Sequence, residues 1–303
     1  MSSSFFGSYL QYTSESEVPA CFSRWSAIAS VATLLERNTW IQFGNKQIYA
    51  NQYIMFIGSS GTRKSTAIDT AHDLLSRAGL DNFSAERTSK EKFLLDLAGE
   101  SDLGGGDNIL ERNLGFDGTS GVHPMHIFVG EANDFFGSGN IEFLSMLGNL
   151  WDWTKQKPYE NKIKNGKSVA ITNPIINILA GNTPEMFAHS FPPEIITQGF
   201  FSRLLLVYGE PNGKRIPFPR TASPEETTTI VHQLQAIRAN HSGEMEYTDT
   251  GKLLLTHIYE TTKGLLDPRF ASYFNRRFVH LLKLCIVVAA AHFRRSVCET
   301  TII

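Results

Sequence analysis

The residues best suited to chemistry lie where a short apolar run, 53–57, leads through small residues into Lys64-Ser65. Such a loop binds phosphate, because backbone N–H groups at a helix N-terminus and the helix dipole both favour an anion. We expect Lys64 to reach the β- and γ-phosphates of a nucleotide and the Ser65 hydroxyl to bind Mg²⁺. The predicted nucleotide-binding residues are Gly58, Ser59, Ser60, Gly61, Thr62, Arg63, Lys64, Ser65 and Thr66.

One position departs from the usual form of this loop, because Arg63 stands where glycine ordinarily precedes the lysine. A chance turn among glycine and serine residues is the alternative interpretation of the stretch. The order of strand, loop and helix, which phosphate binding requires, favours the functional interpretation.

A second candidate group follows the apolar run 126–129, where a nucleotide hydrolase normally carries Asp-Glu. Glu131 is present and is predicted to orient the attacking water, whereas Gly130 occupies the place of the aspartate. Support for a metal would then come from Asp134, one helical turn on, or from Ser65 and water alone. The alternative is that Glu131 is an ordinary surface carboxylate at a strand end.

Two further polar residues are placed at the ends of predicted strands. Asn182 follows the run 175–180, and a polar side chain at the carboxyl end of a central strand faces the ligand crevice of an open α/β sheet. We predict that Asn182 positions the attacking water, although asparagine is also a common turn residue. Arg203, just ahead of the run 204–208, is suited to reach a γ-phosphate, often that of a neighbouring subunit.

A basic hairpin is predicted around Asn165-Gly166, which is a strong hairpin signal. Lys162, Lys164 and Lys167 flank or occupy its tip and could contact nucleic-acid phosphates without regard to sequence. The alternative is a hairpin edge that lysines keep soluble.

The composition suits one large domain or a main domain with an appendage, since 42% of the 303 residues are hydrophobic and 19% are charged. A net charge of −2 excludes a histone-like binder but not a motor whose basic residues lie on one surface. The three scattered cysteines argue against a disulfide framework or a zinc site. We find no signal sequence and no apolar run near the ~20 residues that span a bilayer, so we expect a cytoplasmic protein.

The elements that must position these residues alternate between strand and helix, which predicts an α/β fold with a parallel sheet. The predicted strands are the runs 53–57, 126–129, 175–180 and 204–208. The predicted helices are 19–35, 65–78, 141–153, 227–239, 250–266 and 271–293, with a further start at Thr88 and a hairpin at 40–49. Residues 1–18 are expected to be a loose lead-in, 211–224 a linker, and the glycine-rich stretch 99–124 has no assigned role.

In this order the features resemble the P-loop ATPases of phage and plasmid replication proteins, which are often described as helicases or primase-helicases. Beside the hairpin at Trp40, Asn173-Pro174 and the helix after Tyr273, the resemblance over roughly residues 18–295 rests on four motifs. They are Tyr49-Ala-Asn-Gln-Tyr53 with the loop up to Ala67, the helix around Trp25, Gly181-Asn-Thr-Pro184, and Gly199-Phe-Phe-Ser-Arg203. An Arg-Lys-Ser loop occurs in that family too, so the resemblance makes Arg63 a family trait.

A more distant likeness is to the minichromosome-maintenance helicases of the AAA+ class, which share a non-glycine residue before the loop lysine. It implies a ring, most simply hexameric, with Lys164 and Lys167 in its pore. It also implies a sensor arginine in a C-terminal helical lid, Arg276 or Arg277, which otherwise would be charges on a solvated helix face. Gly130 departs from both patterns.

These resemblances imply a lead-in at 1–50, a P-loop ATPase core at 51–210 and a helical lid at 211–303. They imply a homo-oligomeric motor that uses ATP and Mg²⁺ on single-stranded DNA or a replication fork, with other replication proteins, in the host cytoplasm if phage-encoded. The alternative is a nucleotide-dependent helicase loader or assembly ATPase with weak hydrolysis, which Gly130 favours. Because the chain ends directly after a predicted helix, we expect a further C-terminal segment.

Overall fold

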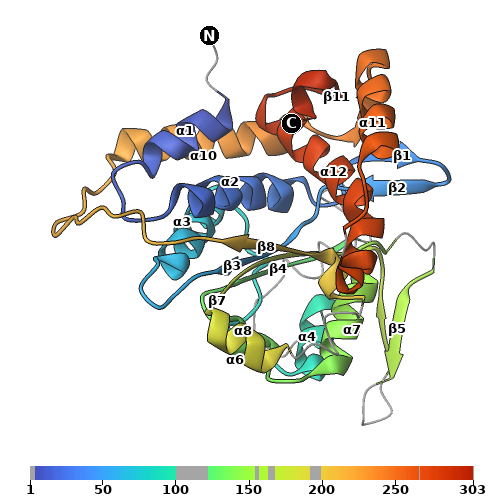
Figure 1. Ribbon diagram of the computed structural model, residues 1–303, viewed down its shortest axis with the longest axis horizontal. Coiled ribbons are helices and arrows are strands. Elements are labelled where there is room, and N and C mark those ends of the chain that lie inside the picture. Colours follow the sequence, from blue (N-terminus) through green and yellow to red (C-terminus); the bar gives the residue numbers. More distant parts are fainter. Residues whose placement is uncertain are drawn as a thin grey trace.

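The computed structural model describes residues 4–99, 122–153, 157–162, 168–191, 199–265 and 267–302. Its centre is a four-stranded parallel sheet in the order β4–β7–β3–β8 (Figure 1). The strands are β3 (Tyr53–Ile57), β4 (His123–Val129), β7 (Pro174–Asn182) and β8 (Leu204–Tyr208). Each contains one of the predicted apolar runs, a pattern typical of strands covered on both faces. The predicted α/β fold with a parallel sheet is confirmed.

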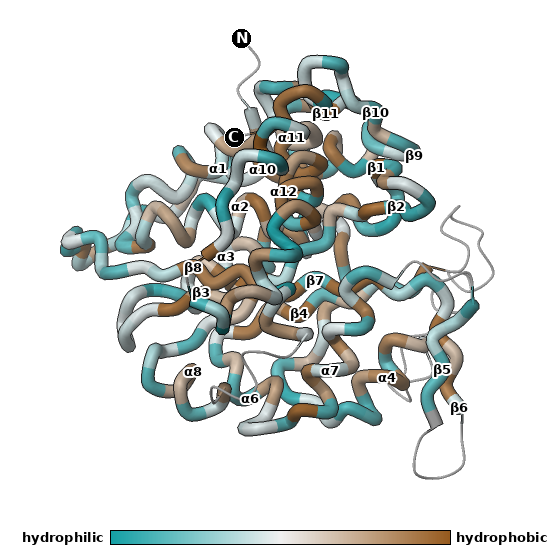
Figure 2. The backbone as a smooth tube through the Cα atoms, turned by 45° about the vertical axis from the view of Figure 1, so that its right-hand side comes forward, coloured by the Kyte–Doolittle hydropathy of each residue, from teal (hydrophilic) through white to brown (hydrophobic). Residues whose placement is uncertain are grey.

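Helices cover both faces of this sheet. Successive side chains of a strand point to opposite faces, and here both faces carry apolar side chains that need to be covered. Along β3, Ile54 and Phe56 enter one core, while Tyr53, Met55 and Ile57 enter the other. The first core is formed with α1 (Phe5–Tyr12), α2 (Ala20–Leu35), α3 (Lys64–Arg77), α10 (Pro224–Asn240), α11 (Asp249–Thr261) and α12 (Ala271–Ala291). The second is formed with α4 (Lys90–Leu97), α6 (Ala132–Phe136), α7 (Ile141–Leu150) and α8 (Pro184–Ser190). Brown segments of the tube mark the hydrophobic residues along these elements (Figure 2).

The first residues do not form the loose lead-in predicted from the sequence, because helix α1 lies there. Phe5 and Tyr9 are fully buried and are one helical turn apart, with ring centroids separated by 5.7 Å. Helix α1 packs on α2 and α10. The helix was not predicted because its two buried residues, Phe5 and Tyr9, stand in a serine-rich stretch. Their burial depends on packing against α2 and α10.

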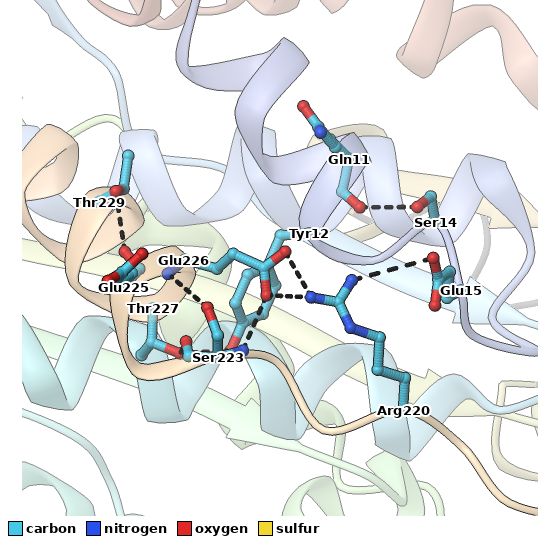
Figure 3. Close-up of polar contacts among 10 residues, drawn as sticks. All are labelled: Gln11, Tyr12, Ser14, Glu15, Arg220, Ser223, Glu225, Glu226, Thr227 and Thr229. Atoms are coloured by element: carbon cyan, nitrogen blue, oxygen red, sulfur yellow. Dashed lines mark hydrogen bonds and ion pairs between the residues drawn. The ribbon is translucent and has the colours of Figure 1, made fainter.

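The segment between β8 and α10 has no regular secondary structure, in agreement with the predicted linker. Figure 3 shows how it is fastened. The Arg220 guanidinium donates to both carboxylate oxygens of Glu226 at 2.7 and 2.6 Å, and lies 3.8 Å from the Glu15 carboxylate. Glu226 and Ser223 form a capping box that starts α10. The linker therefore joins the α1–α2 connection to the start of α10.

Two hairpins lie outside the central sheet. The predicted hairpin at 40–49 is confirmed as β1 (Thr39–Phe43) and β2 (Lys46–Tyr49), and β9 (Gly243–Glu244) extends it. The second predicted hairpin consists of β5 (Tyr159–Lys162) and β6 (Ser168–Ile171), which pair antiparallel. The remaining short elements are β10 (Glu246–Tyr247), β11 (Ser296–Val297), η1 (Phe201–Arg203), η2 (Pro268–Phe270) and η3 (Glu299–Thr301).

Among the helices of the described residues, none combines the length and apolar character needed to cross a membrane. The glycine-rich stretch lies mostly outside the described residues, since 100–121 do not belong to them.

Candidate phosphate-binding site

The predicted phosphate loop joins the end of β3 to the start of α3, at the carboxyl edge of the sheet. Gly58 N–H donates to the Asn182 carbonyl at 3.2 Å, which ties the loop to the end of β7. Thr62 N–H donates to the Ser59 carbonyl at 3.2 Å and closes a turn. At Gly61 the backbone has φ 81°, and a side chain there would point into open space. Ligands of open α/β sheets bind at this edge.

Arg63 precedes the helix in a left-handed conformation, with φ 62° and ψ 27°. A left-handed backbone costs a residue with a Cβ roughly 1–2 kcal/mol, which explains why glycine is usual at the position. The guanidinium turns away from the loop, and its Nε donates to Glu17 Oε2 at 2.9 Å. The pKa of the Glu17 carboxyl is lowered, first by the Ile216 amide that donates to it and then by Arg63. Arg63 thus fastens the loop to the α1–α2 connection.

We predict that Arg63→Gly is more stable than Arg63→Ala by about 1 kcal/mol, because only alanine carries a Cβ in the left-handed region. Both variants lack the ion pair with Glu17, so their difference isolates the backbone effect. Urea unfolding of the two proteins measures it. An alanine variant as stable as the glycine variant would contradict the left-handed conformation.

Lys64 lies across the loop with its side chain almost entirely buried. Its Nζ donates to the carbonyls of Gly58 at 2.7 Å and Ser59 at 3.0 Å, which uses two of the three donors of an ammonium group. Burial lowers the pKa of Lys64, and the negative charges of Glu131 and Glu185 oppose this. The ammonium group therefore keeps one proton to donate to a further acceptor.

Free amide groups lie next to Lys64. Within the described part of the chain, the N–H groups of Gly61, Ser65 and Thr66 donate to no other residue. The last two belong to the first turn of α3, where no intrahelical acceptor exists. Both of these residues are exposed. One ammonium and several unpaired amides form an arrangement that can bind an anion with several oxygens.

Gly130 and Gly181 allow the ends of β4 and β7 to meet the start of α3. A Cβ on Gly130 would lie 2.9 Å from Ser65 Oγ and 3.2 Å from Ser65 Cβ. A Cβ on Gly181 would collide with the Gly130 carbonyl oxygen and lie 3.4 Å from Lys64 Cβ. The position expected to carry an aspartate thus has no space for a side chain while Ser65 stays where it is.

Glu131 and Asn182 lie at this same edge, but in different surroundings. Glu131 is exposed at the start of α6, and its charge acts on Lys64. Asn182 is fully buried. Its Nδ2 donates to Asn133 Oδ1 at 3.3 Å and its Oδ1 accepts from Thr183 N–H at 2.9 Å. Both groups of this amide are therefore engaged, and Asn133 is a neighbour that the sequence did not indicate.

Glu185 is a second residue that sequence reasoning missed. It lies in the first turn of α8, which Thr183 caps by accepting from Met186 N–H at 3.2 Å. A threonine followed by Pro184 and an acidic residue is a helix-start signal, so Thr-Pro-Glu directly after β7 could have placed this carboxylate near the loop.

Asp134, predicted as a possible metal ligand, pairs with Arg87, whose Nη2 lies 2.6 Å from its Oδ2. In the described part of the chain, no group of three or more His, Cys, Asp or Glu side chains could hold a metal ion. A Mg²⁺ ion that arrives with a nucleotide needs fewer protein ligands, because it keeps water and phosphate oxygens around it.

Arg203 lies at the opposite edge of the sheet. The residue after it, Leu204, pairs with Tyr53 at the start of β3, whereas the loop begins after the last residue of β3. The length of β3 separates the two edges by roughly 13 Å. Arg203 is 8% exposed and donates to the Gly199 carbonyl. Burial and the charge of Arg276 lower its pKa, while Asp152 opposes them.

The structure groups Arg203 with Arg276, and neither with Lys64. Asp152 lies between the two arginines, at 3.7 Å from Arg203 Nη2 and 3.8 Å from Arg276 Nη1. Arg276 also donates to Ser202 Oγ at 2.7 Å. Arg277 points elsewhere, because its guanidinium lies 3.7 Å from the centre of the Phe274 ring.

Of the three predicted hairpin lysines, Lys162 belongs to the described residues. Lys164 and Lys167 lie outside the described residues. Lys162 is the last residue of β5, where its backbone pairs with Ser168.

The comparisons with known proteins add no relative. No protein-family model matches the chain, and no curated protein matches it.

Proposed function

We propose that the 58–66 loop is the phosphate-binding loop of a P-loop ATPase core of the AAA+ kind, with α10, α11 and α12 as its helical lid. The chain would then be an ATP-driven motor on single-stranded DNA, such as the ring-forming replicative helicase of a phage or mobile element. The observation that carries the proposal is the Lys64 ammonium held over a loop whose neighbouring amides have no acceptor in the described chain. A triphosphate would satisfy both.

The residues around the loop fit the roles that ATP hydrolysis requires. Lys64 and the amides would bind the terminal phosphates, and Ser65 Oγ would face the magnesium ion. Mg²⁺, when bound, neutralises phosphate charge and orients the terminal phosphate. Since Asp134 is engaged by Arg87, the contacts favour Ser65 and water over Asp134 as its protein-side support. Glu131 would orient the attacking water, and Asn182, fixed by Asn133, would help to position it.

The place of Arg203 supports a role towards a neighbouring subunit rather than its own loop, because the two lie at opposite edges of the sheet. In a ring, the amino edge of one subunit would face the loop of the next. Arg203 would then supply positive charge to a transition state in trans. Its burial means that Asp152 and the Gly199 carbonyl must release it first.

We predict that Lys64→Met and Arg203→Ala, each inactive alone, recover activity when their subunits are mixed. In a random equimolar ring, about a quarter of the interfaces would combine an intact Lys64 with an intact Arg203 in trans. Phosphate release by the mixture measures this recovery. A mixture as inactive as its components would contradict action in trans, and mixing each variant with itself is the control.

One observation favours a second candidate, a loader or assembly ATPase with weak hydrolysis. Gly130 packs against Ser65 and leaves no space for the usual aspartate. Slow hydrolysis with intact nucleotide binding would follow from the missing carboxylate.

ATP hydrolysis with and without single-stranded DNA, together with displacement of a labelled strand from a forked duplex, distinguishes the two candidates. Stimulation by DNA with displacement supports the motor. Nucleotide-dependent assembly without displacement supports the loader. A chain that binds no nucleotide contradicts both.

A further inference from the structure

A second polar cleft lies at the amino edge of the sheet, away from the phosphate loop. It runs between the hairpins β1–β2 and β5–β6, which both views place on the same side of the molecule (Figures 1 and 2). An inner cavity of about 130 Å³ and an outer one of about 660 Å³ share the lining residues Lys46, Asp152 and Trp153. The two cavities are therefore parts of one cleft.

Two cations line the inner cavity, the buried Lys283 and the half-buried Arg37. Lys283 is 2% exposed, and its Nζ donates to the Tyr49 carbonyl at 3.0 Å and to Asn51 Oδ1 at 2.6 Å. Arg37 donates to the Trp153 carbonyl at 2.9 Å and stacks over the Tyr49 ring. Among the described residues, neither cation has a carboxylate within 4.0 Å. The negative charge of Asp152 acts on Lys283 from a greater distance and opposes the lowering of its pKa, but Arg203 and Arg276 share this carboxylate.

Such burial is costly, because a cation taken out of water needs a countercharge. Burial lowers the pKa of Lys283 to about 7, and it lowers the pKa of Arg37 as well. An anion in the inner cavity would supply the missing countercharge to both groups.

The charged side chains around the inner cavity are mostly positive. Four cations lie around Trp151 and Trp153, namely Arg37, Lys46, Arg203 and Arg276. Lys283 adds charge when it is protonated, since its pKa is about 7. The carboxylate among them is Asp152, which Arg203 and Arg276 already share. His280 adds no charge at neutral pH, because burial lowers its pKa to about 4. The cleft therefore attracts anions.

Aromatic rings line the outer cavity. Trp153 and Tyr159 are both partly exposed, and their rings meet edge to face with centroids 5.3 Å apart. Lys46 and Lys157 are exposed beside them. Glu160 is the acidic residue that lines the outer cavity in addition to Asp152. Aromatic rings that reach the surface next to lysines are what proteins use to bind single strands, because any base can stack and any phosphate can pair.

We propose that this cleft binds single-stranded nucleic acid, with a phosphate of the strand in the inner cavity and a base against Trp153 and Tyr159. The choice of a nucleic acid rests on the proposed function, whereas the anion site rests on Lys283 and Arg37 alone. The strand would then meet the root of the β5–β6 hairpin and the lid helix α12, which carries Lys283. Binding of the strand and the position of the lid would then both depend on the contacts of Lys283.

Fluorescence anisotropy of a labelled oligothymidylate, measured without nucleotide, tests the proposal. Trp153→Ala should weaken binding about tenfold or more, and Trp153→Phe should restore most of the affinity, because phenylalanine still stacks. Lys46→Gln with Lys157→Gln should lower the slope of log affinity against log salt by about 0.7 for each phosphate that the variant no longer neutralises. Lys252→Gln with Lys263→Gln, two exposed lysines that line neither cavity, is the matched control.

Oligothymidylate binding that is unchanged in both the tryptophan and the lysine variants would overturn the proposal. The proposal would also be overturned if inorganic phosphate displaced the labelled strand as well as unlabelled oligothymidylate does at the same concentration. That result would show an anion site without strand recognition. Because binding is measured without nucleotide, the outcome is independent of hydrolysis. A chain that binds DNA through Trp153 but does not hydrolyse ATP refutes the motor alone, and a hydrolysing chain whose DNA affinity ignores Trp153 refutes the cleft alone.

Discussion

Replacing Lys64 with methionine should reduce ATP turnover by at least about a hundredfold, because the variant lacks the ammonium group that lies over the loop. Methionine has a similar length and an apolar stem, so it suits the buried path of the lysine side chain. The Ser59 carbonyl that now accepts from Nζ can accept from water at the exposed loop, whereas the buried Gly58 carbonyl loses its partner at a cost of about 1–3 kcal/mol. We therefore expect a folded protein without catalytic activity.

Phosphate release at saturating ATP measures this effect, and thermal unfolding checks the fold. Lys252→Met on α11 is the matched control, since that lysine is exposed and far from the loop in the sequence. Turnover of Lys64→Met within tenfold of the wild type would refute the assignment of the loop to ATP hydrolysis.

Gly181→Ala should destabilise the protein by about 3 kcal/mol, at the upper end of the range for overpacked cores. The new Cβ would meet the Gly130 carbonyl oxygen, and a backbone atom cannot rotate away. The strands involved are paired in register up to Val129 and Ala180, so relief requires their ends to separate. Because Gly130 and Gly181 lie against the start of α3, separating these strand ends should lower ATP turnover as well.

Urea unfolding followed by circular dichroism measures the decrease in stability. Gly264→Ala serves as the control, because its new Cβ would have no neighbour closer than 3.8 Å and the residue is exposed. A Gly181→Ala protein as stable as this control would mean that the strand ends are further apart than described.

The four central strands were predictable because each contains a short, largely apolar run bounded by turn residues. Helix α3 was predictable too, since Gly79 closes it with φ 91°. Helices α1 and α8 were not predicted. The first has two buried aromatic residues within a serine-rich stretch, and the second is seven residues long with its one buried side chain at Ser190. Short elements with few apolar positions depend on their neighbours for stability.

The strand–loop–helix at 53–77 is a local feature, and the sequence by itself determined it. Its strand, its turn and its first helical residues lie within one short stretch, so backbone preference and apolar pattern suffice to predict them. The sequence also singled out Arg63 and Gly130 as the two departures from the usual loop and strand end.

Only the tertiary structure decided what those two departures mean. Arg63 binds Glu17, 46 positions earlier, and Gly130 packs against Ser65 because the order β4–β7–β3–β8 brings their strands to one edge. Because β8 runs parallel to β3, Arg203, which precedes β8, lies at the far edge, beside Arg276 and Asp152. Contacts of this kind join residues far apart in the chain, and local pattern carries no information about which strand lies beside which.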